Sequence, residues 1–100
     1  MTRARIAIPK EDIAAFCLRN QIRSLALFGS VLRDDFRADS DIDILVDFES
    51  DAVVGMVALG RMQRELSALL ARPVDLVPRV GLKPRIRDSV LATSEELYAR

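Results

Sequence analysis

Two aspartates, Asp41 and Asp43, are separated by one residue in a segment that alternates apolar and polar side chains. Residues two apart on a β-strand project to the same face, so the two carboxylates are expected to lie side by side. Like charges at this spacing repel each other, and a magnesium ion that binds carboxylate oxygens together with substrate phosphates relieves the repulsion. The pair therefore indicates a magnesium site, although an acidic strand that faces solvent has the same pattern.

A third aspartate, Asp75, lies in a short apolar segment, residues 74–77, between Pro73 and Pro78. If this segment is a strand beside residues 41–48, its carboxylate joins the other two. Three carboxylates can hold two metal ions about 3.5–4 Å apart, which is the spacing used for in-line phosphoryl displacement. The alternative is an aspartate on the exposed side of an edge strand.

Gly29 and Ser30 interrupt the chain after the alternating segment 22–28. Glycine lets the backbone approach a ligand closely, and a helix that starts at this point presents unpaired N–H groups to a phosphate. This interpretation competes with an ordinary turn in which Ser30 caps a short helix through Arg33.

These residues must be positioned by the elements around them. Apolar spacing predicts helices over residues 9–20, 52–71 and 84–91, and strands over residues 22–28, 41–48 and 74–77. Pro9 suits a first helical position, and Asn20 is expected to end that helix in a left-handed turn. Residues 95–100 are expected to form a terminal turn or an edge strand. The order predicts one α/β (α+β) domain over residues 1–100, a two-layer fold with helices packed against a small mixed sheet.

The composition limits the function classes. The chain has 15 basic and 15 acidic residues, so its formal net charge is zero, and it has only four Phe and one Tyr as aromatic residues. Nucleic acid is therefore a disfavoured partner, because strand binding needs a basic track and stacking surfaces. The absence of histidine excludes Ser-His-Asp and Cys-His catalysis and favours an oxygen-liganded metal. The single cysteine, Cys17, and the lack of a long apolar run predict a cytoplasmic protein without a membrane span.

Two segments, 27–33 (LFGSVLR) and 39–46 (DSDIDILV), closely resemble the signature of the polymerase-β-like nucleotidyltransferases. In that family a Gly-Ser turn and a helix precede Ser-Asp-x-Asp on a strand, and a third aspartate lies on a later strand. Residues 72–77 (RPVDLV) are similar to that third position. The similarity is greatest to the minimal nucleotidyltransferase (MNT) branch, small prokaryotic proteins often encoded beside a HEPN partner. The resemblance implies the polymerase-β-like nucleotidyltransferase fold.

The resemblance also implies a role for each matching residue. Gly29 and Ser30 would hold the triphosphate of a nucleoside triphosphate. Asp41 and Asp43 would bind both of two Mg²⁺ ions, and Asp75 would complete the second metal site and help to activate the attacking hydroxyl.

Arg33 stands one helical turn beyond the Gly-Ser pair, where the resemblance implies a positive clamp on the phosphates. The alternative is a surface arginine paired with Asp34 or Asp35. Many relatives have Arg-Gly where this chain has Arg33-Asp34, which puts the local loop shape in doubt and leaves the three aspartates unaffected. Asp47 shares the strand face of Asp43 but lies farther along the strand, and we expect it to be solvated.

The implied reaction moves AMP from ATP to a tyrosine of a HEPN toxin ribonuclease and releases pyrophosphate, so that the protein acts as an antitoxin. One alternative is a binding module that neutralises a toxin by covering it. Another is a transferase that acts on a nucleic acid or a small-molecule acceptor. Apolar residues within 52–71 and 80–98 are candidate contacts for a protein partner, with an ordinary core as the competing interpretation.

Overall fold

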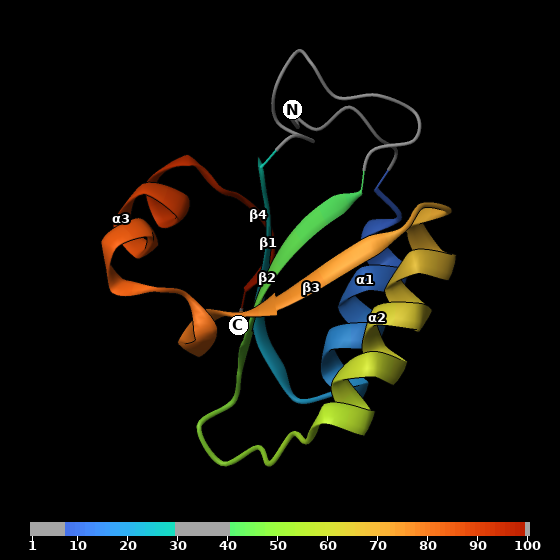
Figure 1. Ribbon diagram of the computed structural model, residues 1–100. Coiled ribbons are helices and arrows are strands. Elements are labelled where there is room, and N and C mark those ends of the chain that lie inside the picture. The colour runs from blue at the N-terminus through green and yellow to red at the C-terminus, as the bar shows by residue number, and fades with distance from the viewer. Residues whose placement is uncertain (1–7, 30–40, 100) are drawn as a thin grey trace.

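The computed structural model describes residues 8–29 and 41–99. In chain order the elements are α1 (Lys10–Arg19), β1 (Ile22–Phe28), β2 (Ile42–Phe48), α2 (Met56–Leu70), β3 (Val74–Pro78), the short 3₁₀ helix η2 (Arg79–Gly81), α3 (Pro84–Thr93) and β4 (Glu95–Ala99). The four strands form one sheet in the order β3-β2-β1-β4, with α1 and α2 on one side and α3 on the other (Figure 1).

The sheet is mixed. β1 pairs antiparallel with β2 on one side and with β4 on the other, whereas β2 and β3 pair in parallel. Parallel neighbours need a crossover connection, and α2 supplies it between β2 and β3. The predicted small mixed sheet with packed helices is confirmed. Of the two structures predicted for residues 95–100, a terminal turn or an edge strand, the structure shows the edge strand, because β4 is an outer strand of the sheet.

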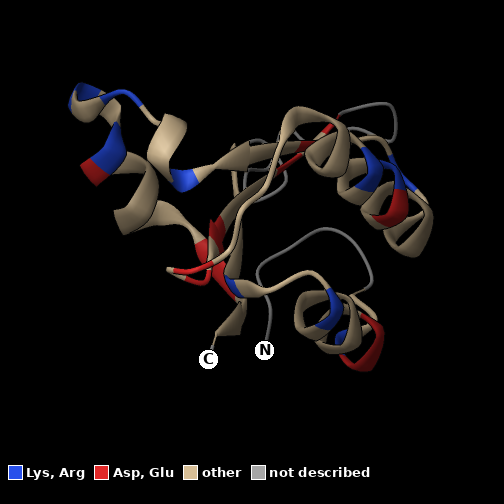
Figure 2. Ribbon diagram, turned by 90° about the horizontal axis from the view of Figure 1, so that it is seen from below, with Lys and Arg blue, Asp and Glu red and all other residues tan. Residues whose placement is uncertain are grey.

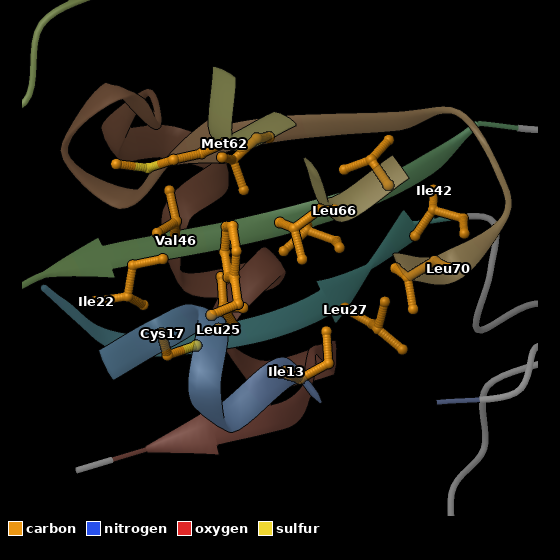
Figure 3. Close-up of a cluster of buried hydrophobic side chains, with 14 residues drawn as sticks. Ile13, Cys17, Ile22, Leu25, Leu27, Ile42, Val46, Met62, Leu66 and Leu70 are labelled. Carbon is orange, nitrogen blue, oxygen red and sulfur yellow. The ribbon is translucent and has the colours of Figure 1, made fainter. Parts of the chain in front are cut away.

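The core lies between the sheet and the pair α1 and α2. The strict alternation of β2 places Ile42, Ile44 and Val46 on this face, where each is fully buried. Phe16 from α1 and Leu66 from α2 are also fully buried. Figure 3 shows the labelled side chains of both helices pointing toward those of β1 and β2. Burial of each large apolar side chain contributes about 1.5–3 kcal/mol, so this face fixes the register of the strands.

The second helix begins later than its apolar pattern predicted. Residues 52–55 are not helical, and α2 starts at Met56. Gly55, which precedes it, has an extended backbone with φ −89° and ψ 177°. The predicted start at Ala52 was wrong because hydrophobic spacing alone does not detect where the backbone turns into the helix.

The end of the first helix also differs from the expectation. Asn20 has φ −108° and is not left-handed, whereas the next residue, Gln21, has φ 55°. The Asn20 side-chain Nδ2 donates a hydrogen bond to the Phe16 carbonyl at 2.9 Å, and its backbone N–H donates to the same oxygen at 3.2 Å. These bonds keep Asn20 close to helical geometry and move the left-handed residue one position along. Pro9 is the residue before the first helical position, not the first helical residue itself.

Charged residues of both signs are interspersed over the described elements (Figure 2). Arg19 of α1 forms an ion pair with Glu65 of α2, and both side chains are solvent-accessible, so the pair contributes little to stability. No helix in residues 8–29 and 41–99 is long and apolar enough to cross a membrane.

Candidate active site

Asp43 and Asp75 occupy paired positions on the adjacent parallel strands β2 and β3. Paired residues of neighbouring strands project to the same face, so the two carboxylates share the face opposite the core. The neighbours of Asp75 along β3, Val74 and Leu76, are buried on the helix-covered side, whereas Asp75 is exposed. The predicted strand around Asp75 and its position beside β2 are thus confirmed.

Asp41 lies just before the first residue of β2. It is exposed, and the next residue, Ile42, donates its backbone N–H to the Pro73 carbonyl at 2.9 Å. Within residues 8–29 and 41–99, no three acidic, cysteine or histidine side chains gather into a group that could hold a metal ion. The structure therefore brings together two of the three expected ligands, Asp43 and Asp75. Asp41 lies just before β2, two residues from Asp43 in the chain.

Gly29 follows β1 directly and lies against the Asp43 carboxylate. Phe28, the last residue of β1, pairs with Asp43, and Gly29 has φ +78°, a left-handed conformation that side chains disfavour. A Cβ atom built on Gly29 would collide with Oδ2 of Asp43 and lie 3.3 Å from its Cγ. The predicted approach of Gly29 to a phosphate stays a prediction, and the neighbour of this glycine in the structure is the Asp43 carboxylate.

Two predicted site residues, Ser30 and Arg33, lie outside the described residues, as does the short helix expected after Ser30. Their roles stay predictions. Gly29, the last described residue before them, lies next to Asp43.

Asp47, which was expected to be solvated, is only partly exposed. Its side chain is only 25% exposed, and its Oδ2 lies 3.5 Å from Nη1 of Arg79. The pairing follows from the β2–β3 register, because Val46 is opposite Pro78, and the next residues in the chain are Asp47 on β2 and Arg79 at the start of η2. Sequence reasoning did not identify Arg79. A basic residue directly after the last strand residue, Pro78, was the only available signal.

The carboxylate face has a hollow between the sheet and α3. This cleft has a volume of about 370 Å³ and is lined by residues of β1, β2, β4, η2 and α3. A larger, mainly apolar hollow of about 640 Å³ lies at the far end of β2, around Phe48, Met56 and Val80. Asp41, Asp43 and Asp75 line neither hollow.

Several large apolar side chains beside the larger hollow are exposed. Val53, Met56, Val57 and Val80 have exposed fractions between 83% and 96%. The predicted excess of apolar residues in the segments 52–71 and 80–98 is therefore real at these positions. Other apolar residues of the same segments, including Leu66 and Leu82, are buried in the ordinary way.

Cys17 takes no part in this face. It is fully buried under the sheet in α1, and burial raises the pKa of its thiol from 9.0 to about 12. The thiol stays protonated at neutral pH, and a buried neutral thiol is not a nucleophile. Cys17 therefore supplies no nucleophile to this face.

Comparison with known proteins identifies similar sequences and folds. A family model described as a nucleotidyltransferase domain matches residues 10–95. The chain is 40% identical over 70 residues to the protein adenylyltransferase MntA of Thermococcus cleftensis, a match that covers 70% of this chain and 69% of that protein. A solved structure described as a minimal nucleotidyltransferase is 36% identical and has a TM-score of 0.71, with 85% of each chain covered.

Two further solved structures are similar in fold, each at 22% identity. One is a toxin–antitoxin with AMP-PNP, with a TM-score of 0.74 over 93% of this chain and 75% of that chain. The other is a tri-AMPylated HEPN toxin of Shewanella oneidensis in complex with an MNT antitoxin, with a TM-score of 0.66 over 91% of this chain and 70% of that chain.

Proposed function

Because this chain belongs to the family of nucleotidyltransferase domains, we propose that it transfers AMP from ATP to a tyrosine of a HEPN-type toxin and so acts as an antitoxin. The observation that carries the proposal is the register pairing of Asp43 with Asp75, directly beside the backbone of Gly29. The adenylyltransferase relative and the AMPylated HEPN toxin that is bound to a similar fold support AMP as the transferred group and a toxin as the acceptor.

The donor set fits magnesium. Asp41, Asp43 and Asp75 offer only carboxylate oxygens, the hard ligands that Mg²⁺ shares with phosphate groups. Asp43 and Asp75 share a face, and Asp41 directly precedes the strand that carries Asp43. Magnesium bound there would neutralise phosphate charge and help to orient the reacting groups. Asp41 and Asp43 would hold both ions, with Asp75 completing the second site.

The triphosphate would lie at the Gly29 end of β1. Gly29 gives the backbone a close approach without a side chain, and Ser30 and Arg33 would supply a hydroxyl and a positive charge from the segment that follows. The existing contact between Gly29 and Asp43 would place the phosphates and the carboxylates against each other.

In the proposed reaction the phenol oxygen of the acceptor tyrosine bonds to the α-phosphorus of ATP. The bond from that phosphorus to the oxygen bridging to the β-phosphate breaks, and pyrophosphate leaves with the electron pair. Asp75 takes the phenol proton and passes it to solvent. Asp75 is suited to this role because it is exposed on β3, an outer strand of the sheet, where another protein can reach it.

Labelled ATP tests the proposal. The protein is co-purified with its partner and incubated with magnesium and ATP labelled at either the α- or the γ-phosphate. AMP transfer places the α-label on the partner and leaves the γ-label in pyrophosphate. Incorporation of the γ-label would indicate phosphorylation instead, and incorporation of neither label in an active complex would favour neutralisation by masking.

A further inference from the structure

Asp75 lies on β3, an outer strand of the sheet whose strand neighbour is β2. Successive residues of a strand direct their backbone N–H and C=O groups to alternate edges. The Pro73 carbonyl faces β2, because it accepts the Ile42 N–H at 2.9 Å. The backbone groups of Asp75 therefore also face β2, and those of its two neighbours, Val74 and Leu76, face the outer edge.

Two side chains of α2 occupy this outer edge. Gln63 Oε1 accepts the Leu76 N–H at 2.9 Å. Ser67 Oγ accepts the Val74 N–H at 3.1 Å. The Ser67 hydroxyl donates its own hydrogen to the Gln63 carbonyl at 2.9 Å, which leaves the hydroxyl oxygen free to accept from β3. The N–H groups on both sides of Asp75 are thus held by one helix.

The spacing of the helix matches the spacing of the strand at these two bonds. Gln63 and Ser67 are four residues apart, so they lie on one face of α2 with a rise of about 6 Å between them. Val74 and Leu76 are two residues apart on β3, a rise of roughly 6.6 Å. α2 runs alongside β3 in the opposite direction (Figure 1), so the earlier helix residue meets the later strand residue.

We propose that Gln63 and Ser67 are positioning residues for Asp75: by holding both flanking N–H groups, they keep its carboxylate on the same face as that of Asp43. The inference rests on the proposed nucleotidyl transfer, in which Asp75 takes the phenol proton and completes the second metal site. Both helix residues act through the backbone of β3, because their side chains end at its outer edge.

Protection of the strand edge is the competing role for these bonds. An outer strand offers N–H groups to which a strand of another protein can add, and covering them prevents such pairing. Protection of this kind needs no particular relation to the site. Here the two covered N–H groups bracket the aspartate of β3, and a misplacement of about 1 Å at a reacting group costs up to roughly a hundredfold in rate.

Four variants separate the two roles. Gln63→Met and Ser67→Ala each remove one acceptor from the edge of β3 and keep a side chain that suits a helix. Gln63→Glu is the conservative variant, because its carboxylate still accepts the Leu76 N–H. Ile13→Val is the control for lost stability, since Ile13 is fully buried on α1, which packs on β1, β4 and α2.

Three measurements are made on each folded variant. Hydrogen exchange followed by NMR reports the protection of the Val74 and Leu76 N–H groups, and so observes the two bonds directly. Thermal unfolding gives the melting temperature. Transfer of label from α-labelled ATP to the partner protein gives kcat and the KM for MgATP.

We expect Gln63→Met and Ser67→Ala each to speed exchange at the N–H group that it releases and to lower kcat about tenfold, with the KM for MgATP within about twofold of the wild type. The KM should hold because Asp41 and Asp43, the ligands proposed for both metal ions, lie before and on β2. Gln63→Glu should keep both the protection and the rate. Ile13→Val should lower the melting temperature and leave kcat unchanged.

Wild-type kcat in a variant whose released N–H group exchanges rapidly would overturn the positioning role and leave edge protection in its place. A loss of kcat in Ile13→Val as large as that in Gln63→Met would also overturn it, because the rate would then follow stability alone. A wild type that transfers no label to its partner would overturn the proposed function, and this inference with it.

Discussion

The backbone of Gly29 is packed against the carboxylate of Asp43, so closely that any β-carbon at position 29 would overlap Oδ2 of that aspartate. The contact joins the turn after β1 to the first half of β2 at the place where both strands end their pairing. Glycine therefore suits this position for two reasons, its left-handed backbone angle and the space it leaves for the Asp43 carboxylate.

Gly29→Ala is expected to damage both stability and activity. The left-handed φ of +78° costs alanine about 1–3 kcal/mol, and the methyl group displaces the Asp43 carboxylate. Thermal unfolding should show a lower melting temperature, by roughly 4–8 °C for each kcal/mol lost, and label transfer from α-labelled ATP should fall sharply.

Gly55→Ala is the matched control for this substitution. Gly55 has φ −89°, and a Cβ built there meets nothing within 4 Å. Its melting temperature and its transfer rate should stay close to those of the wild type. Equal loss of both quantities in the two glycine variants would contradict a special role for the contact between Gly29 and Asp43.

Asp43→Asn and Asp75→Asn are each expected to reduce AMP transfer at least about a hundredfold, because each removes a charged ligand from the proposed metal site. The fold should persist, since Asp75 is exposed and the core lies on the opposite face. Asp12→Asn, at an exposed position on α1, should leave transfer unchanged. Wild-type rates in either site variant, measured with magnesium and ATP, would remove that residue from the site.

The strand pattern around the aspartates was readable from the sequence because its physical cause is local. Alternation from Ile42 to Val46 reflects one fully buried face, although Leu45 on the opposite face is also buried. The register that places Asp75 opposite Asp43 was not readable. It depends on how α2 spans the sheet, and a crossover of this kind is set by packing between residues far apart in the chain.

Other details were missed for equally specific reasons. The helical stripe of α2 extends in sequence to Ala52, yet the backbone at Gly55 is extended, so the apolar residues before it are exposed and not helical. The ion pair between Asp47 and Arg79 arises only when β3 lies beside β2. The cleft under α3 depends on how far that helix stands from the sheet, which no local pattern encodes.

Magnesium and ATP together should raise the melting temperature by more than the sum of their separate effects. In the proposed site, metal and phosphates share the carboxylate face, so each ligand should improve the affinity for the other. A two-dimensional titration followed by thermal unfolding measures this coupling. Strictly additive shifts in the wild type would indicate separate sites, and Asp43→Asn, which lacks a shared ligand, should show additive shifts.

The buried thiol predicts an alkaline loss of stability. The pKa of Cys17 is about 12 in the folded state and 9.0 when unfolded, so its contribution is complete below pH 9 and is lost as the pH rises toward 12. Native protein should therefore resist iodoacetamide at pH 9, whereas urea-unfolded protein should react rapidly.

Cys17→Ala separates this effect from the titration of other alkaline groups. The variant should be less sensitive than the wild type to a rise in pH between 9 and 12, as measured by urea unfolding at each pH. Identical pH profiles for the two proteins, or rapid alkylation of the native wild type, would contradict a buried, protonated Cys17.

The central claim is catalytic modification of a protein partner, and the intact mass of that partner tests it most directly. The protein is co-expressed with its HEPN-type toxin, the two are separated under denaturing conditions, and the toxin is weighed, refolded and assayed for ribonuclease activity. We expect a toxin heavier by one or more AMP units on tyrosine and inactive after separation, and an unmodified toxin when the co-expressed protein carries Asp43→Asn and Asp75→Asn. An unmodified toxin that regains full ribonuclease activity after separation from the wild-type protein would contradict the account and establish masking in its place.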